Sequence, residues 1–211
     1  VMAVVKSELI QLRDKFGDER RTKIVKGGVK NMSEEDMVQE QAAMLTLTSS
    51  GYVKRTNPTE YRKQNRGGVG VVDLNTKDED FVTIFLEGST HDHILFFTDK
   101  GKVYQCRMYE VPEGKRATKG KSMMNVLPLA GDEKVTSIVT MPKDMKSKAE
   151  ASAFMLITEK VLAKKVNADQ FADVRKSGII AMGLQKEDRL IAALPGMKGN
   201  TVILTTSGGQ A

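Results

Sequence analysis

Three basic segments recur at the same position within a repeated unit of the chain, and their lysines and arginines could neutralise a polyanion. Residues 52–70, 102–120 and 162–180 each follow a short turn and together hold 14 basic against 5 acidic side chains. The other 154 residues hold 19 basic and 22 acidic ones. In a stacked repeat, such segments form a continuous ridge that would bind nucleic-acid phosphates by releasing counterions. The alternative is a solvated, solubilising surface.

Other reactive side chains do not assemble into a catalytic or metal-binding pattern. His91 and His93 lie two apart before an expected strand, which could begin a metal site, but no further ligand cluster accompanies them and a structural role is preferred. Asp78, Glu79 and Asp80 could suggest a magnesium site, yet acidic pairs recur in every repeat and are interpreted as structural. We therefore expect no metal, cofactor or catalytic residue in this chain.

The bulk composition fits a cytoplasmic protein with an anionic partner. Thirty-three Lys and Arg against 27 Asp and Glu give a formal charge of +6 and a pI near 9.3. Cys106 is the only cysteine and is expected in a strand, so no intrachain disulfide can form. The sequence has neither an apolar run of membrane-spanning length nor a secretion signal. Because the first residue is Val, the chain is expected to be an excerpt.

The elements that carry the basic segments are expected to be β-hairpins. An apolar run, a turn and a second strand occur at residues 44–54, 94–104 and 154–164, and a fourth copy begins at 202. The fourth turn position is Gly51, Gly101 and Gly209 in three copies, as a tight turn with positive φ requires. It is Val161 in the third copy, so that copy is predicted to turn differently.

Two more strands complete each repeat. An acidic pair leads into an apolar strand at residues 35–38, 79–82, 132–135 and 187–190. A further strand is expected after each of the first three hairpins, at residues 69–74, 122–127 and 179–184. Four short strands per unit of about fifty residues predict an all-β propeller of four-stranded blades. The chain would hold about three blades and the start of a fourth, so it stops before the ring closes.

A short helix is expected before the repeats. Met2, Val5, Leu9, Leu12 and Phe16 follow steps of three and four, and Gly17 is a plausible end. From the residues alone, this is either an ordinary amphipathic helix or the end of a coiled coil.

Several stretches resemble the C-terminal region of the bacterial gyrase A subunits, and the similarity extends over essentially the whole chain. They are residues 16–22, 51–55, 66–68, 90–97 and 125–129. The resemblance implies a β-pinwheel, a propeller variant that exchanges strands between blades, attached to a coiled coil. Residues 1–17 would then be the end of that coil, and residues 18–211 a partial DNA-wrapping domain.

The family's wrapping motif, the GyrA box, reads Gln-Arg-Arg-Gly-Gly-Lys/Arg-Gly, and residues 64–70 match it in part. Gln64, Arg66 and the three glycines are retained, whereas Asn65 and Val69 replace two basic positions. Arginine can grip a phosphate with two donors, and glycines let the backbone approach it. The two missing charges are expected to weaken wrapping, and the preceding Arg62 and Lys63 to restore part of the charge.

The resemblance implies that the domain wraps duplex DNA and supports ATP-dependent negative supercoiling by the whole enzyme. Regions outside this chain would bind ATP, Mg²⁺, the gyrase B subunit and a second copy of the A subunit. The family's DNA-cleaving tyrosine would also lie outside this chain. Two alternatives stay open: the A-type subunit of topoisomerase IV, with weak wrapping, and a protein-binding propeller scaffold. The predicted DNA-binding residues are Lys54, Arg55, Arg62, Lys63, Gln64, Asn65, Arg66, Gly67, Gly68, Gly70, Lys102, Arg107, Lys115, Arg116, Lys119, Lys164, Lys165, Arg175 and Lys176.

Overall fold

The structure is a computed structural model that describes residues 1–18, 22, 34–61, 80–141, 153–196 and 199–209. It divides into two units, Val1–Glu34 and Glu35–Ala211. The first contains helix α1 (Met2–Phe16), which ends where the Gly17 N–H donates to the Arg13 carbonyl at 2.7 Å. Its side chains are exposed. None of the helices in the described ranges has the length and apolar character that a bilayer span needs.

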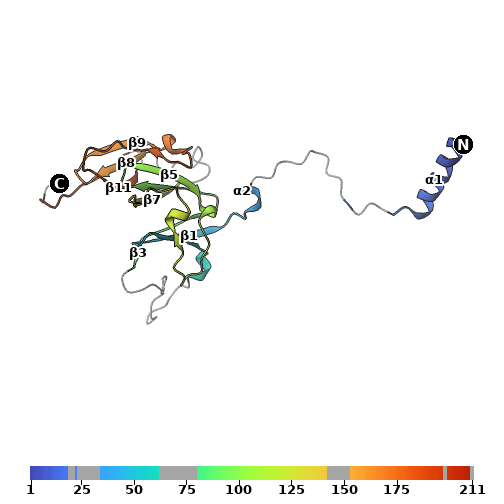
Figure 1. The fold of residues 1–211 in the computed structure, drawn as a ribbon, viewed down its shortest axis with the longest axis horizontal. Coiled ribbons are helices and arrows are strands. Elements are labelled where there is room, and N and C mark those ends of the chain that lie inside the picture. The colour runs from blue at the N-terminus through green and yellow to red at the C-terminus, as the bar shows by residue number, and fades with distance from the viewer. Residues whose placement is uncertain (19–21, 23–33, 62–79, 142–152, 197–198, 210–211) are drawn as a thin grey trace. The chain divides into compact units, whose positions relative to one another are not determined.

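The second unit is built almost entirely of strands (Figure 1). The short helix α2 (Glu34–Met37) precedes the strands, and 3₁₀ turns follow the hairpins. The strands are β1 (Ala42–Thr48), β2 (Tyr52–Thr56), β3 (Val82–Ser89), β4 (His93–Thr98), β5 (Lys102–Arg107), β6 (Lys121–Ser122), β7 (Val135–Met141), β8 (Ala153–Thr158), β9 (Ala163–Asn167), β10 (Ile179–Ile180) and β11 (Leu190–Gly196).

These strands form three antiparallel sheets in which neighbouring repeats exchange strands. The first sheet has the order β3-β1-β2-β6, the second β10-β5-β4-β7 and the third β11-β8-β9. Strand β6 follows the β4–β5 hairpin in the chain but pairs with β2, and β10 follows β8–β9 but pairs with β5. Each of these two sheets therefore takes its fourth strand from the next repeat. The predicted all-β pinwheel is confirmed.

The middle sheet is buried on both faces. Along β4, Ile94 and Phe96 pack with residues of the first sheet, whereas Leu95 and Phe97 pack with the third. Successive side chains of a strand point to opposite faces, so an uninterrupted apolar run suits a sheet that has neighbours on both sides. On the side of the third sheet, the rings of Phe97, Phe154 and Phe171 lie with centroids 5.5–5.8 Å apart.

The hairpin turns share one geometry, including the third. The fourth turn residue has φ of 78° at Gly51, 72° at Gly101 and 63° at Val161. In each turn its N–H donates to the carbonyl of the turn threonine at 2.9–3.0 Å. The prediction that the third copy turns differently is therefore wrong: the strand register imposes the left-handed conformation even on valine.

Acidic residues just before strands β3, β7 and β11 accept hydrogen bonds from residues of the hairpin turns. Asp80 accepts hydrogen bonds from Ser49 Oγ and the Ser50 amide, and Asp188 accepts one from the Lys160 amide. Glu133 accepts from Thr98 Oγ1 at 2.6 Å. These contacts give the recurring acidic pairs a structural role.

Three details differ from the predicted elements. Residues 35–38 belong to helix α2 and its end rather than to a strand, and Glu35 there lies 3.5 Å from Arg107. The strands expected at 122–127 and 179–184 shrink to the two-residue β6 and β10, because the chain pairs with the neighbouring sheet only briefly before it turns. Residues 202–206 form no strand, and the Thr206 carbonyl instead begins a turn, where it accepts from the Gly209 amide at 3.0 Å.

Candidate nucleic-acid interface

The basic segment of the second repeat lies against the edge of the first sheet. The Arg55 amide donates to the Pro112 carbonyl, and the Gly114 amide donates back to the Arg55 carbonyl, both at 2.9 Å. Val53 then pairs with Lys121 in β6. The backbone of residues 112–121, here called the rim loop, is thus held along β2.

Side chains of the first repeat fasten the rim loop further. Arg55 forms an ion pair with Glu113 at 3.0 Å, and Thr56 Oγ1 donates to the Gly114 carbonyl at 3.1 Å. The carboxylate of Glu60 accepts a hydrogen bond from the Arg116 amide at 2.7 Å. These bonds leave the loop backbone little freedom, so this backbone does not have to be ordered when a ligand binds.

Four cations of the rim loop face solvent. Lys115, Lys119 and Lys121 are exposed and Arg116 is half-buried, and the side chains of these four form no ion pair with another described residue. The Lys119 ammonium lies 3.9 Å from the ring centroid of Tyr52, a cation–π contact that fixes its position. Lys121 is not among the predicted DNA-binding residues, because it lies one residue past the basic segment 102–120.

The second sheet has an equivalent but smaller basic edge. Gln105 of β5 donates to the Phe171 carbonyl and accepts from the Val174 amide. The intervening chain continues into β10 and leaves Arg175 and Lys176 exposed. Lys176 Nζ is 3.7 Å from a Glu110 oxygen but remains 93% exposed. The exposed cations of two successive repeats therefore lie on the edges of two successive sheets.

The remaining predicted cations differ in their surroundings. Lys164 and Lys165 are exposed on β9, and Lys164 Nζ donates to the Ala181 carbonyl at 3.0 Å. Lys102 is half-buried at the start of β5. Lys54 is 1% exposed, and its ammonium donates to the Arg116 carbonyl. The side chain of Arg55 is 12% exposed.

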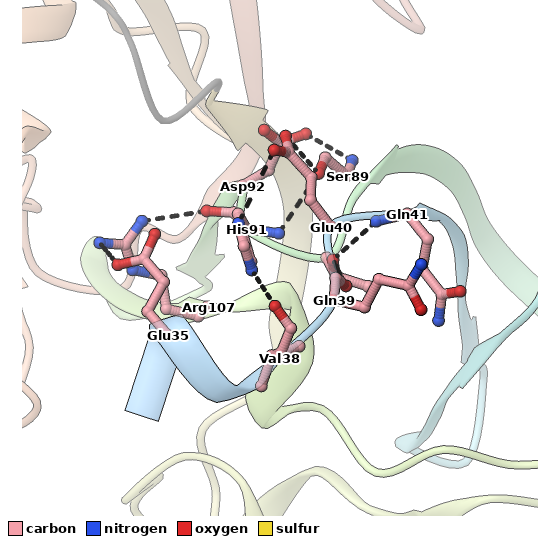
Figure 2. A network of polar contacts seen from close by, with 10 residues as sticks. Glu35, Val38, Gln39, Glu40, Gln41, Ser89, His91, Asp92 and Arg107 are labelled. Carbon is pink, nitrogen blue, oxygen red and sulfur yellow. Dashed lines mark hydrogen bonds and ion pairs between the residues drawn. The ribbon is translucent and has the colours of Figure 1, made fainter. Parts of the chain in front are cut away.

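Arg107 belongs to a polar network that joins the chain before β1 to the end of β5. Figure 2 shows its guanidinium between Glu35 and the His91 carbonyl, to which it donates at 3.0 Å. His91 Nε2 lies 2.9 Å from the Val38 carbonyl, and Ser89 Oγ donates to Glu40. The predicted structural role of His91 is consistent with these contacts.

Burial of His93 and the nearby positive charge of Arg107 lower the pKa of His93. In the described ranges, no three His, Cys, Asp or Glu side chains are grouped so that they could hold a metal ion.

Tyr104 and Cys106, both expected in strands, have pKa values above their ordinary ones. Burial raises the pKa of Tyr104 to about 12, and its hydroxyl donates to Glu133 at 3.0 Å. Burial likewise raises the pKa of the Cys106 thiol to about 12, so very little of it is thiolate near neutral pH.

The partial box and the residues before it lie outside the described residues. This set comprises Arg62, Lys63, Gln64, Asn65, Arg66, Gly67, Gly68 and Gly70. Their assignment to DNA stays a prediction, as does that of the described cations.

Stacked antiparallel sheets that exchange their fourth strand and carry lysines on their edges define a pinwheel-type repeat domain. Comparison with known families gives the same class: residues 43–86, 92–140 and 153–196 match the family described as DNA gyrase C-terminal domain, beta-propeller. The chain belongs to this family.

Individual relatives agree with this assignment. The chain is 40% identical over 192 residues to the A subunit of DNA gyrase from Staphylococcus epidermidis, and equally to the one from Staphylococcus aureus. The match covers 91% of this chain but only 21% of either relative, so the chain spans about a fifth of their length.

Two solved structures share the fold. A C-terminal domain of DNA topoisomerase IV superposes with a TM-score of 0.60 at 26% identity, covering 75% of this chain and 47% of that one. A DNA gyrase A C-terminal domain gives 0.56 at 25% identity, covering 72% and 47%.

Proposed function

We propose that this domain binds duplex DNA along the edges of its blades and bends it. One observation carries the proposal: the rim loop is fastened to the neighbouring blade by its backbone, while four of its cations form no ion pair with another described residue. A fixed row of lysines neutralises phosphates without reading bases, and a curved row bends the duplex. Bending a short site by 40–90° costs about 1–6 kcal/mol, which added phosphate contacts offset.

In the whole protein, the domain would support ATP-dependent negative supercoiling as part of a gyrase A-type subunit. The partner subunits, a second A-type chain and a B-type chain, would bind elsewhere in the longer protein, where ATP and Mg²⁺ would also act. The names of the relatives and the family match support this assignment.

A topoisomerase IV A-type subunit is the second candidate. Two observations favour it: the topoisomerase IV domain superposes at least as well as the gyrase domain, and Asn65 and Val69 depart from the box. Reconstitution of the whole A-type subunit with a B-type chain distinguishes the two, because only the gyrase assignment predicts that relaxed plasmid becomes negatively supercoiled.

DNA binding is tested by removing three exposed rim lysines together. Lys115, Lys119 and Lys121 are replaced by Ala, and the slope of log K against log salt is measured with linear duplex. Each lost phosphate contact lowers the magnitude of the slope by about 0.9, so the triple variant should lose about 2.7.

The matched control removes the same charge from the hairpin-turn end of the sheets, at Lys100, Lys134 and Lys160. The control variant should keep the original slope. Equal losses in both variants would mean that general charge, rather than the rim, attracts DNA. Bending is measured separately, as the linking-number change after a nicked plasmid is sealed in the presence of the domain. No shift at saturating protein would refute wrapping.

A further inference from the structure

We infer that Lys54 is a positioning residue for the rim loop rather than a ligand of phosphate. The inference rests on the proposed DNA binding and assigns a separate task to one cation of the predicted set. Lys54 lies in the middle of β2 with only 1% of its surface exposed. A side chain this deeply covered cannot approach a DNA phosphate unless the loop above it opens.

The rim loop folds over the Lys54 side chain between two glycines. A Cβ atom added at Gly114 would lie 3.4 Å from Lys54 Cβ and 3.6 Å from Cδ. One added at Gly120 would lie 3.1 Å from Lys54 Cβ and 2.5 Å from the Val53 carbonyl oxygen. Both glycines let the loop lie close against the lysine stem, and Gly120 also needs its φ of +85° to do so.

The ammonium group meets the loop between these glycines, where it donates to the carbonyl of Arg116. That bond holds the backbone from which the Lys115 and Arg116 side chains project, and Glu60 holds the amide of the same Arg116. A carbonyl left without its buried donor would lose a hydrogen bond that water replaces only if the loop lifts. Lys54 thus acts on DNA through the loop.

The second blade repeats the arrangement with a different side chain. Tyr104 lies six residues after its turn threonine, as Lys54 does, and the basic segment of the third repeat crosses it at Gly178. Gly178 has φ of +76°, and an added Cβ would lie 2.7 Å from the Tyr104 ring. In both blades, therefore, a long buried side chain supports a left-handed glycine of the following basic segment.

Three variants of the full chain test the inference. Lys54→Met keeps the apolar stem and removes the ammonium. Lys115→Met makes the same change at an exposed position of the loop and serves as the matched control. Gly120→Ala leaves all charges in place and displaces the loop, so it tests positioning even if Lys54→Met fails to fold.

Two measurements are made on each variant: amide hydrogen exchange of residues 112–121 and the salt slope of DNA binding. We expect Lys115→Met to lower the slope by about 0.9 with unchanged exchange. Lys54→Met and Gly120→Ala should both speed exchange in the loop. Lys54→Met should lower the slope by more than the single charge that it removes, and Gly120→Ala should lower it without any charge change.

A loss of about 0.9 in Lys54→Met with unchanged exchange would identify Lys54 as a direct phosphate ligand and overturn the inference. So would unchanged exchange and slope in both Lys54→Met and Gly120→Ala. If the unaltered chain shows no salt-dependent affinity for DNA, the proposed function fails, whereas the exchange measurement still decides whether Lys54 holds the loop.

Discussion

The turn at Val161 stores backbone strain that a single glycine should remove. Val161 has φ of 63°, a conformation that its counterparts Gly51 and Gly101 adopt freely. For residues other than glycine, the left-handed region costs roughly 1–2 kcal/mol. The Val161 side chain is 48% exposed, so its burial offsets little of this strain.

The expected gain for Val161→Gly follows from two opposing terms. Relief of strain contributes about 1–2 kcal/mol, and the greater freedom of glycine in the unfolded chain takes back roughly 0.5–1 kcal/mol. With the middle of each range, the net increase in the free energy of unfolding is about 0.75 kcal/mol. For a unit of this size, 1 kcal/mol moves the Tm by about 2–4 °C, so the Tm should rise by about 1.5–3 °C.

Gly51→Val is the matched control, measured with Val161→Gly by thermal unfolding under circular dichroism. A Cβ at Gly51 would have nothing within 4 Å, so this substitution introduces only the unfavourable φ. We expect its Tm to fall while that of Val161→Gly rises. If Val161→Gly unfolds at an unchanged or lower temperature while Gly51→Val is destabilised, the third turn is not strained and the reasoning is refuted.

Three further changes probe the buried and paired groups. Burial alone would raise the pKa of Glu133, but hydrogen bonds from Thr98, Ala130 and Tyr104 prevail and lower this pKa. The Glu133 carboxylate therefore stabilises the fold at pH values above its ordinary pKa of 4.5, and this stabilisation is lost as the pH falls through the lowered pKa. Acid titration of the free energy of unfolding should accordingly be shallower in Glu133→Gln. Arg107→Met should speed hydrogen exchange in residues 35–41, because it removes the ion pair to Glu35. Cys106, with a raised pKa and 8% exposure, should react with a thiol reagent at pH 8 only as fast as the protein unfolds.

The hairpins could be predicted from the sequence because their signals are local. An apolar run, a turn glycine and a second strand lie within about a dozen residues, and β4 with β5 follows that pattern closely. The sequence does not predict in the same way which sheet a short strand joins. Ser122 pairs with Tyr52, seventy positions earlier, and no property of the short segment names its partner.

The candidate interface, too, could be predicted where its signal is local and not where it depends on distant residues. The phase of the basic segments indicated which part of each repeat reaches the sheet edge, and Lys115, Lys119, Arg175 and Lys176 lie there exposed. Burial of Lys54 could not be foreseen, because it depends on a loop of the next repeat folding over it. Residues 35–38 share their composition with true strand starts, yet they form a helix end where Arg107 pairs with Glu35.

Exchange of the fourth strand also governs how this protein can assemble. The first sheet stays incomplete until Lys121 and Ser122 have been synthesised, although its own hairpin ends at Thr56. Pairings across such sequence separations form slowly, and an unpaired β2 edge would remain open in the meantime. A cut between Glu110 and Val111 would therefore split two blades at once. Folding should proceed in overlapping pairs of repeats, and a single repeat should not be separable as an independent folding unit.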